Sequence, residues 1–326
     1  MNEDDLVIDA FEARAQRRHD RRALFTAALG AAAVGSAFAY ANPALAQAAV
    51  TDADVLNFAL NLEYLEAQFY LYAVNGTGLP ATLTGSGSTA GGTVTGGAQV
   101  DFSGDTLVGA YAREIAADEQ AHVNFLRTAL GSAAVAMPNI NISGAADGPF
   151  TAAARAAGVV DSTSGVFNPY ADPTSFLLGA YIFEDVGVTA YKGAAPLLSN
   201  KTFLEAAAGI LAVEAYHAAI VRTTLYAKGV PALVEATEKI SAARDALDGS
   251  PTEDLIRGIA PKDDAGIMPS GSGATLTSNI APLNVNGLAY SRSTGQVLNI
   301  VYLNAATATM GGFFPNGVNG NIRSTT

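Results

Sequence analysis

The chain has 326 residues, of which 49% are hydrophobic and 15% charged, with a formal net charge of −12 and no cysteine. The absence of cysteine excludes disulfides, thiolate metal sites, iron–sulfur clusters and a cysteine nucleophile. The acidic balance argues against nucleic acid or an anionic membrane as a partner, and the length allows one large domain or one domain with a substantial appendage.

The first 48 residues have the features of an export signal. A basic segment ends in the pair Arg21–Arg22, an apolar run at 23–41 follows, and the sequence A-Q-A at 46–48 fits a cleavage site. The arginine pair is typical of a twin-arginine signal, with an ordinary secretory signal or an uncleaved anchor as alternatives. We therefore expect a soluble mature chain in the periplasm or outside the cell, without stable membrane insertion.

Hydrophobic periodicity predicts two helices in the next part of the chain, at about 52–74 and 105–130. Residues 76–104 between them are rich in Gly, Thr and Ser, which predicts a long surface loop or loose hairpin and is the first place where we expect disorder. About forty residues then precede the third long helix, with a short helix near 151–157. A connection of this length suits a crossover along a helical bundle.

Three further helices are expected, and two have recognisable capping residues. Asp172 followed by proline opens the third long helix, which runs to about position 192. Thr202 and Glu205 have the spacing of a capping box at the start of the fourth, which ends at a glycine at 229. The fifth is expected at 231–247, with these charged residues on its exposed side: Glu235, Glu238, Lys239 and Arg244.

The chain after the signal divides into a predicted helical bundle at 49–248 and a C-terminal extension at 249–326. The extension is rich in Gly, Asn, Ser and Pro, but Ser293 and Gln296 have capping-box spacing and predict a helix that runs to Tyr302. Because this helix is too apolar to be left in water, we expect the extension to dock on the bundle.

Two of the three histidines share a local pattern. Glu119-x-x-His122 and Glu214-x-x-His217 each place a Glu three residues before a His, so on a helix both side chains share one face and can bind one metal ion. Only ten glutamates follow position 48, so chance gives a His such a partner roughly 4% of the time. The alternative is a pair of capped or surface histidines on amphipathic helices. The third, His19, lies in the export signal.

Two further glutamates complete a symmetrical set. Glu63 and Glu184 are each followed seven residues later by a tyrosine, Tyr70 or Tyr191, which suggests two related helical hairpins. The order Glu, Glu-x-x-His, Glu, Glu-x-x-His is what a four-helix bundle needs to hold two metal ions in its core. The predicted metal ligands are therefore Glu63, Glu119, His122, Glu184, Glu214 and His217.

This ligand set determines the expected cofactors. Four buried carboxylates would carry a charge of about −4, which two divalent cations would neutralise. Oxygen-rich ligation with one imidazole per metal favours two iron or manganese ions, although zinc could occupy the site opportunistically. Two such ions about 3.5–4 Å apart can bind O2 or peroxide between them.

Neighbouring residues leave alternatives open. Glu66 lies one turn from Glu63 and could be the first-helix ligand instead, but the tyrosine repeat favours Glu63. Asp185 points about 100° away from the ligand before it, and Glu114 and Asp118 are expected on the surface or beside the ligands. The tyrosines could hydrogen-bond the ligands or carry an electron, but we expect ordinary core packing for each: Tyr70, Tyr111, Tyr191 and Tyr216.

The helical part of the chain resembles the ferritin-like superfamily. Residues 56–70 (LNFALNLEYLEAQFY) are similar to the opening helix of secreted ferritin-like-domain proteins. Residues 296–302 (QVLNIVY) and 311–320 (GGFFPNGVNG) resemble the C-terminal region of plant and bacterial desiccation-related proteins. The resemblance implies an all-α, ferritin-like four-helix bundle with a long crossover between its second and third helices, a dinuclear iron or manganese site, and a role in oxidative or desiccation stress.

Three functions remain open, and the sequence does not decide whether the chain is an enzyme. The preferred one is a di-metal site that consumes peroxide or oxidises Fe(II). The others are a non-catalytic stress-protective or interaction protein that retains the fold, and a metal-sequestering protein. The lack of cysteine excludes a rubredoxin-type electron-entry module, and the long loops and tail argue against a storage cage. A homodimer would suit exposed apolar helix faces.

Overall fold

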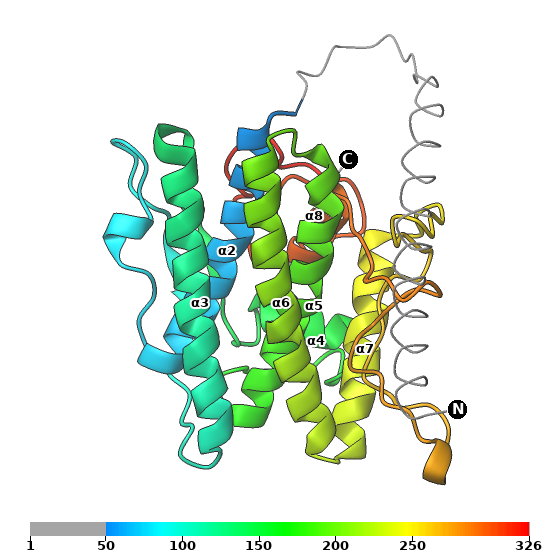
Figure 1. Cartoon of the computed structure of the whole chain (residues 1–326). Coiled ribbons are helices and arrows are strands. Elements are labelled where there is room, and N and C mark those ends of the chain that lie inside the picture. The colour runs from blue at the N-terminus through cyan, green and yellow to red at the C-terminus, as the bar shows by residue number, and fades with distance from the viewer. Residues whose placement is uncertain (1–49, 326) are drawn as a thin grey trace, which may run out of the picture. The chain divides into compact units, whose positions relative to one another are not determined.

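Four long helices form a bundle in the structure, a computed structural model that describes residues 50–325. They are α2 (Asp52–Asn75), α3 (Thr106–Leu130), α5 (Pro173–Ala194) and α6 (Lys201–Ala227) (Figure 1). α2 and α3 form one antiparallel hairpin, α5 and α6 form another, and a long crossover joins α3 to α5. The predicted all-α architecture is confirmed. The predicted export signal at 1–48 lies outside the described residues.

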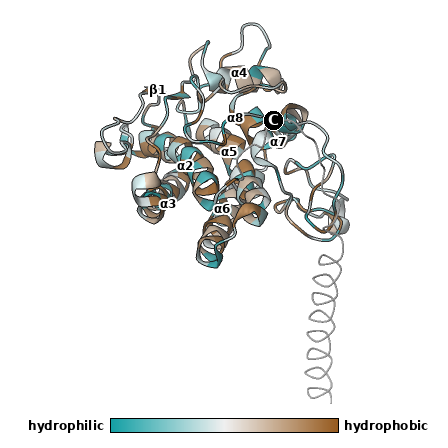
Figure 2. Cartoon of the chain, turned by 90° about the horizontal axis from the view of Figure 1, so that it is seen from above, coloured by the Kyte–Doolittle hydropathy of each residue, from teal (hydrophilic) through white to brown (hydrophobic). Residues whose placement is uncertain are grey.

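The bundle has an inner and an outer pair of helices (Figure 2). α2 and α5 lie between the outer pair and the rest of the chain, and their side chains are buried around nearly the whole helix. α3 and α6 bury one face each and expose the other. A helix that is apolar all round requires cover on every side. α2 and α5 also bury acidic side chains among their apolar ones. A buried carboxylate requires a hydrogen-bond donor or a positive charge beside it.

Capping side chains set the starts of the long helices. Thr51 caps α2 within a capping box, and Asp172 caps α5. The capping box predicted at Thr202 and Glu205 is wrong, because the Asn200 side chain accepts the first free N–H groups of α6. Asn is as favourable a cap as Thr, so the helix begins slightly earlier than the spacing pattern suggests.

The two long connections meet through short strands. β1 (Val94–Gly96) lies in the first connection and pairs in parallel with β2 (Ile140–Ile142) in the crossover. The sequence predicts a loop or hairpin for the first connection and gives no sign of this pairing, because three-residue strands carry too little periodicity. The crossover also contains α4 (Pro149–Ala156), close to the expected short helix.

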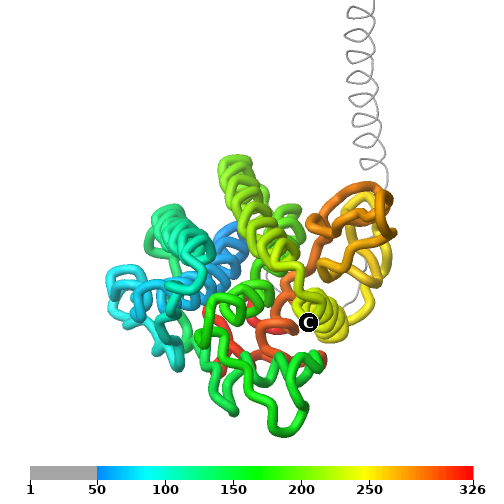
Figure 3. The backbone as a smooth tube through the Cα atoms, turned by 90° about the horizontal axis from the view of Figure 1, so that it is seen from below, coloured from blue at the N-terminus to red at the C-terminus, as the bar shows by residue number. Residues whose placement is uncertain are grey.

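Two further helices follow the bundle. α7 (Pro231–Asp248) comes directly after α6, and α8 (Thr294–Val301) packs against α5 and α7. The capping box predicted at Ser293 and Gln296 is confirmed, and the apolar residues of α8 are buried. In Figure 3 the yellow and orange residues after α7 gather beside that helix, whereas the red tail lies against the crossover.

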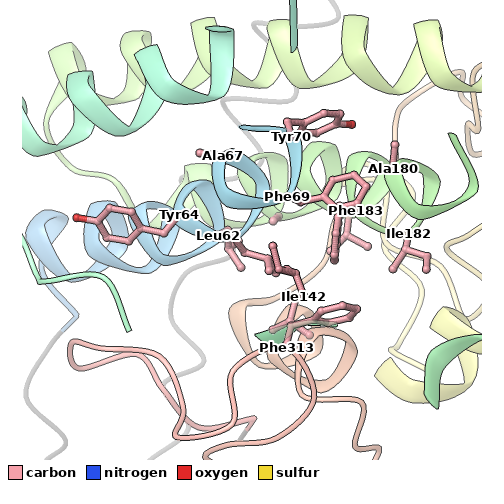
Figure 4. Packing of buried hydrophobic residues seen from close by; sticks show 14 of the residues in the cluster. Leu62, Tyr64, Ala67, Phe69, Tyr70, Ile142, Ala180, Ile182, Phe183 and Phe313 are labelled. Carbon is pink, nitrogen blue, oxygen red and sulfur yellow. The ribbon is translucent and has the colours of Figure 1, made fainter. Parts of the chain in front are cut away.

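The C-terminal tail contributes to the core and contacts α2. The Phe313 ring packs edge-on against Phe150 of α4 and Phe183 of α5, with ring centroids 5.1 and 4.9 Å apart (Figure 4). The amide of Asn61 donates to the Asn319 carbonyl (2.8 Å), and the Asn319 N–H donates back to the Asn61 side chain (2.9 Å). These contacts tie the tail to the helices that carry the predicted ligands.

Three buried arginines join the extension to the bundle. Arg222 of α6 donates to Asp185 (2.8 Å) and to backbone carbonyls of the extension. Arg244 of α7 bridges Asp185 (3.0 Å) and Asp264 (2.7 Å). Arg292, which precedes α8, binds further aspartates of this network. The predicted exposure of Arg244 is wrong: only 2% of the residue is exposed, because the extension covers that face of α7.

α6 is long and apolar enough, by length and composition, to cross a membrane. The core helix of a bundle has the same signature, so this observation is weak by itself. α6 also carries three buried ionisable side chains, Glu214, His217 and Arg222, that contact neighbouring elements. We therefore treat α6 as a bundle helix.

Candidate metal centre

All six predicted ligands come together inside the four-helix bundle, in two groups. Within each group, ligand atoms of all members lie within 4.8 Å of one another, and every member is buried. The first group is Glu63, Glu119, His122 and Glu214. The second group is Glu184, Glu214 and His217. Each of the four helices therefore supplies at least one ligand atom, as the sequence pattern predicts.

Glu119 and Glu214 lie between the two groups. Oε2 of Glu119 is 3.6 Å from Nδ1 of His122, and its Oε1 is 3.0 Å from Nδ1 of His217. Glu214 belongs to both groups and approaches His122 to 3.9 Å. The two imidazole rings are 6.3 Å apart, centroid to centroid. Glu119 and Glu214 therefore lie close to both groups, whereas Glu63 belongs to the first group and Glu184 to the second.

Both histidines direct Nδ1 into the centre. Nδ1 of His122 is 3.2 Å from Oε2 of Glu63. On His217, Nε2 lies 3.1 Å from Oδ2 of Asp118, a partly exposed residue of α3. A carboxylate that accepts the Nε2–H leaves the Nδ1 lone pair free for a metal and fixes the ring orientation. Asp118 was expected either on the surface or beside the ligands, and the structure places it beside His217.

Two tyrosines hydrogen-bond the terminal ligands across the bundle. The Tyr70 hydroxyl of α2 donates to Oε1 of Glu184 on α5, and the Tyr191 hydroxyl of α5 donates to Oε1 of Glu63 on α2. The expectation of ordinary core packing is therefore wrong for both. It is also wrong for Tyr216, which is 69% exposed. Each donor holds one carboxylate oxygen and leaves the other directed toward the histidines.

Glu66, the alternative first-helix ligand, is buried beside the same centre but belongs to neither group. Glu63 belongs to the first group, which supports the choice of Glu63; that choice remains a prediction. Asp185 faces away from the centre and pairs with Arg222 and Arg244 instead, as its 100° offset from Glu184 predicts.

Gly187 of α5 leaves room for the Glu214 carboxylate. A Cβ at this position would lie 2.2 Å from Oε2 of Glu214 and 3.0 Å from its Cδ, closer than packing allows. Glycine inside a helix costs about 1 kcal/mol relative to alanine. The close approach of the carboxylate explains why it is present. The sequence pattern did not identify Gly187 as part of the site. The one sign of its role in the sequence is that a glycine stands within a mostly apolar helix.

Burial raises the pKa values of most carboxyl groups in the centre. Desolvation, followed by the charge of Glu119, raises the pKa of Glu63 to about 7, and desolvation raises the pKa of Glu184 to about 8. Desolvation and neighbouring carboxylates hold the pKa of Glu66 and Glu214 well above the ordinary value of 4.5. Without cations, several of these groups therefore hold protons.

Glu119 and the two histidines behave in the opposite way. Burial would raise the pKa of Glu119, but the adjacent imidazoles of His122 and His217 hold it at about 2. Burial would lower the histidine pKa values, but the surrounding glutamates raise the pKa of His122 to about 11 and that of His217 to about 9. Metal binding here would therefore release protons from the imidazoles, as expected for such ligands.

Several buried ligand atoms have no hydrogen bond of good geometry. They are both carboxylate oxygens of Glu119, both of Glu214, Oε2 of Glu184 and Nδ1 of His217. Most buried polar atoms in proteins have a partner, so a cluster of unpartnered ones that share one centre calls for an ion. Carboxylate oxygens with imidazole nitrogen form a donor set that suits iron or manganese. The residues present therefore fit a metal-binding role.

Comparison with known proteins identifies the family. The family described as Ferritin-like domain matches residues 51–227, the segment that contains α2 to α6 and all six predicted ligands. The chain belongs to the ferritin-like family. This confirms the resemblance seen in the sequence.

Two curated relatives match this ferritin-like protein over a longer part of the chain than the family model does. The ferritin-like catalase Nec2 of Nesocodon mauritianus is 31% identical over 285 residues, which cover 83% of this chain and 84% of that protein. The desiccation-related protein PCC13-62 of Craterostigma plantagineum is 28% identical over 290 residues, which cover 84% of this chain and 85% of that protein. No solved structure gives a significant match.

Proposed function

We propose that the chain is an exported, dinuclear iron or manganese protein that consumes hydrogen peroxide. The observation that carries the proposal is the pair of ligand groups that share Glu214 and lie on either side of Glu119. Two ions held in this way can exchange the two electrons that each peroxide gives or takes. The name of the relative Nec2, a ferritin-like catalase, supports the same reaction.

Under this proposal, Glu63 and His122 would help to hold one ion and Glu184 and His217 the other, and Glu119 and Glu214 lie near both histidines and would contribute carboxylate oxygens. Bound iron or manganese supplies the redox change that turns two peroxide molecules into two waters and one O2. The protein groups keep the ligands fixed: Asp118 retains the Nε2 proton of His217, and the two tyrosine hydroxyls orient the terminal carboxylates.

The centre is most exposed on the side of the outer helices, α3 and α6. The side chain of His122 is 10% exposed and that of Asp118 is 43% exposed, whereas the glutamate ligands are almost fully buried. The inner side is covered by the crossover and the extension. We infer that a molecule as small as peroxide enters between α3 and α6, past Asp118.

The test is oxygen evolution from peroxide by the full mature chain loaded with iron or manganese. The proposal predicts turnover above that of free metal, with one O2 formed for every two peroxide molecules consumed. The double variant His122→Ala/His217→Ala should lose both metal and turnover. Absence of metal-dependent turnover in a loaded, folded wild type would overturn the catalytic proposal.

The second candidate is a non-catalytic, stress-protective ferritin-like protein, which the relative named desiccation-related protein PCC13-62 favours. A protein that only sequesters metal is a related alternative. The stress-protective and the sequestering function both predict metal binding without peroxide turnover. Oxidation of Fe(II) by O2, measured in the same preparations, separates a ferroxidase from either.

A further inference from the structure

A second acidic cluster lies where α7 meets the extension. Asp245 and Asp248 are in the last turn of α7, and Asp263 follows in the extension. Ligand oxygens of these three residues lie within 4.8 Å of one another. The cluster shares no residue with the bundle centre, and nothing in the proposed peroxide chemistry uses it.

Two oxygens of this cluster are buried and have no hydrogen-bond partner within residues 50–325. Asp248 accepts from Arg292 Nε through Oδ2 (2.5 Å), and Asp263 accepts from Arg292 Nη2 through Oδ1 (3.0 Å). The second oxygens, Oδ1 of Asp248 and Oδ2 of Asp263, make no hydrogen bond, although both side chains are fully buried. A buried carboxylate oxygen without a donor is costly, so an additional positive group is needed here.

The charge of the surrounding network leads to the same conclusion. Three buried arginines face five aspartates: Arg222, Arg244 and Arg292 against Asp185, Asp245, Asp248, Asp263 and Asp264. Lys262 also acts on Asp245, so one negative charge remains when all these groups are ionised. A bound cation would offset this excess. Without it, burial raises the pKa of Asp248 to about 7 and that of Asp263 to about 6.

We propose that a Ca²⁺ ion binds between Asp245, Asp248 and Asp263 and fastens the C-terminal extension to α7. Carboxylate oxygens are the ligands that Ca²⁺ prefers, and Ca²⁺ accepts irregular sets completed by water. A cavity of about 430 Å³ lined by Asp248 and Arg292 adjoins the cluster and offers room for such waters. Mg²⁺ requires stricter octahedral geometry, which three carboxylates already held by an arginine and a backbone N–H suit less well.

Asp245→Asn is the variant that tests the site with least disturbance. Asp245 forms no ion pair with an arginine of the described residues, and its Oδ1 accepts the backbone N–H of Asp263 (3.3 Å), which an asparagine oxygen can also accept. The variant therefore removes one charge and one anionic ligand and retains the hydrogen bond. Glu253→Gln is the matched control, because Glu253 is an exposed acid of the extension outside the cluster.

The experiment is calorimetric titration of Ca²⁺ into the full mature chain with its bundle metal in place, combined with thermal unfolding. We expect one Ca²⁺ per chain and a rise in Tm of about 3–5 °C at tenfold excess over Kd. Asp245→Asn should weaken binding at least tenfold, while Glu253→Gln should bind as the wild type does. If Asp245→Asn does not fold, hydrogen exchange of the wild type replaces it, with Ca²⁺-dependent protection expected across 245–263.

Three results would overturn the proposal. The first is absence of binding up to about 10 mM Ca²⁺, beyond the weakest range of protein calcium sites. The second is equal Ca²⁺ affinity in Asp245→Asn and the wild type. The third is binding that disappears in His122→Ala/His217→Ala but persists in Asp245→Asn, which would place the ion in the bundle.

Discussion

The Tyr191 hydroxyl on α5 donates a hydrogen bond to Glu63 on α2, a residue 128 positions earlier in the chain. Tyr70 and Glu184 form the reciprocal pair across 114 positions. Each hairpin therefore orients a carboxylate that belongs to the other. The seven-residue spacing between Glu and Tyr recurs in α2 and α5 because each of these helices carries one carboxylate that accepts a hydrogen bond and one tyrosine that donates one to the other helix.

Replacement of Tyr191 by Phe should weaken metal binding without unfolding the bundle. The ring and its packing remain, but Glu63 loses the donor that orients it. Loss of such a partner of a ligand typically lowers metal affinity by about 10–100-fold. Competition with a chelator of known affinity measures the change. Tyr216→Phe is the control, because Tyr216 is exposed on α6, and an equal loss there would contradict the orienting role.

Gly187→Ala should disrupt the centre although alanine favours helices. The new methyl group would displace the Glu214 carboxylate, since its carbon would lie 2.2 Å from Oε2. We expect loss of at least one metal ion per chain in elemental analysis. Gly209→Ala on α6 is the matched control: nothing lies within 4 Å of its Cβ, so it should retain metal and gain up to about 1 kcal/mol of stability. Full metal content in Gly187→Ala would contradict this account.

Arg292→Ala should strongly destabilise the protein. It leaves Asp248 and Asp263 buried without their counter-charge, and breaking a buried pair in this way costs about 3–5 kcal/mol. Urea unfolding monitored by circular dichroism measures the free energy of unfolding. Lys239→Ala, which breaks an exposed pair with Glu235, should leave the midpoint unchanged. A small effect of Arg292→Ala would mean that the network contributes little to docking of the extension.

The metal-free protein should lose stability as the pH rises from about 4.5 to 8. Glu63 and Glu184 have folded-state pKa values of about 7 and 8, above the ordinary 4.5, so their contribution is full below pH 4.5 and is lost as they ionise. His122, with a pKa of about 11, adds a loss of the same sign above pH 6.5. Glu119 acts oppositely, with a loss as the pH falls from 4.5 to 2.

Thermal unfolding across this pH range, with and without metal, tests the assignment. Metal binds the deprotonated ligands, so the loaded protein should become more stable relative to the metal-free protein as the pH rises. Parallel profiles with and without metal would show that these groups are not the ligands.

The clustering of the candidate ligands could be predicted from sequence because helical spacing sets each Glu-x-x-His pair on one face. Glu119 and His122, three residues apart, share a face in any regular helix, and α3 is regular there. The cross-bundle tyrosine bonds could not be predicted, since a partner depends on how α2 and α5 pack. The spacing along each helix therefore identifies the candidate residues, whereas the packing of α2 against α5 determines which tyrosine contacts which glutamate.

The buried arginine network shows a second limit of sequence reasoning. On an amphipathic helix, Arg244 follows the pattern of an exposed residue, and only the extension that covers it makes it buried. That extension is mostly irregular, so its path has no periodic signal. Its apolar helix near Ser293 was predictable from a capping box and hydrophobic composition, whereas the ion pairs between Arg292 and the aspartates were not.

Elemental analysis of the mature protein, purified from its native host without added metal, is the decisive test of the dinuclear centre. We expect about two iron or manganese ions per chain, and their loss in His122→Ala/His217→Ala. A well-folded wild type without either metal would contradict a dinuclear centre built from these two ligand groups.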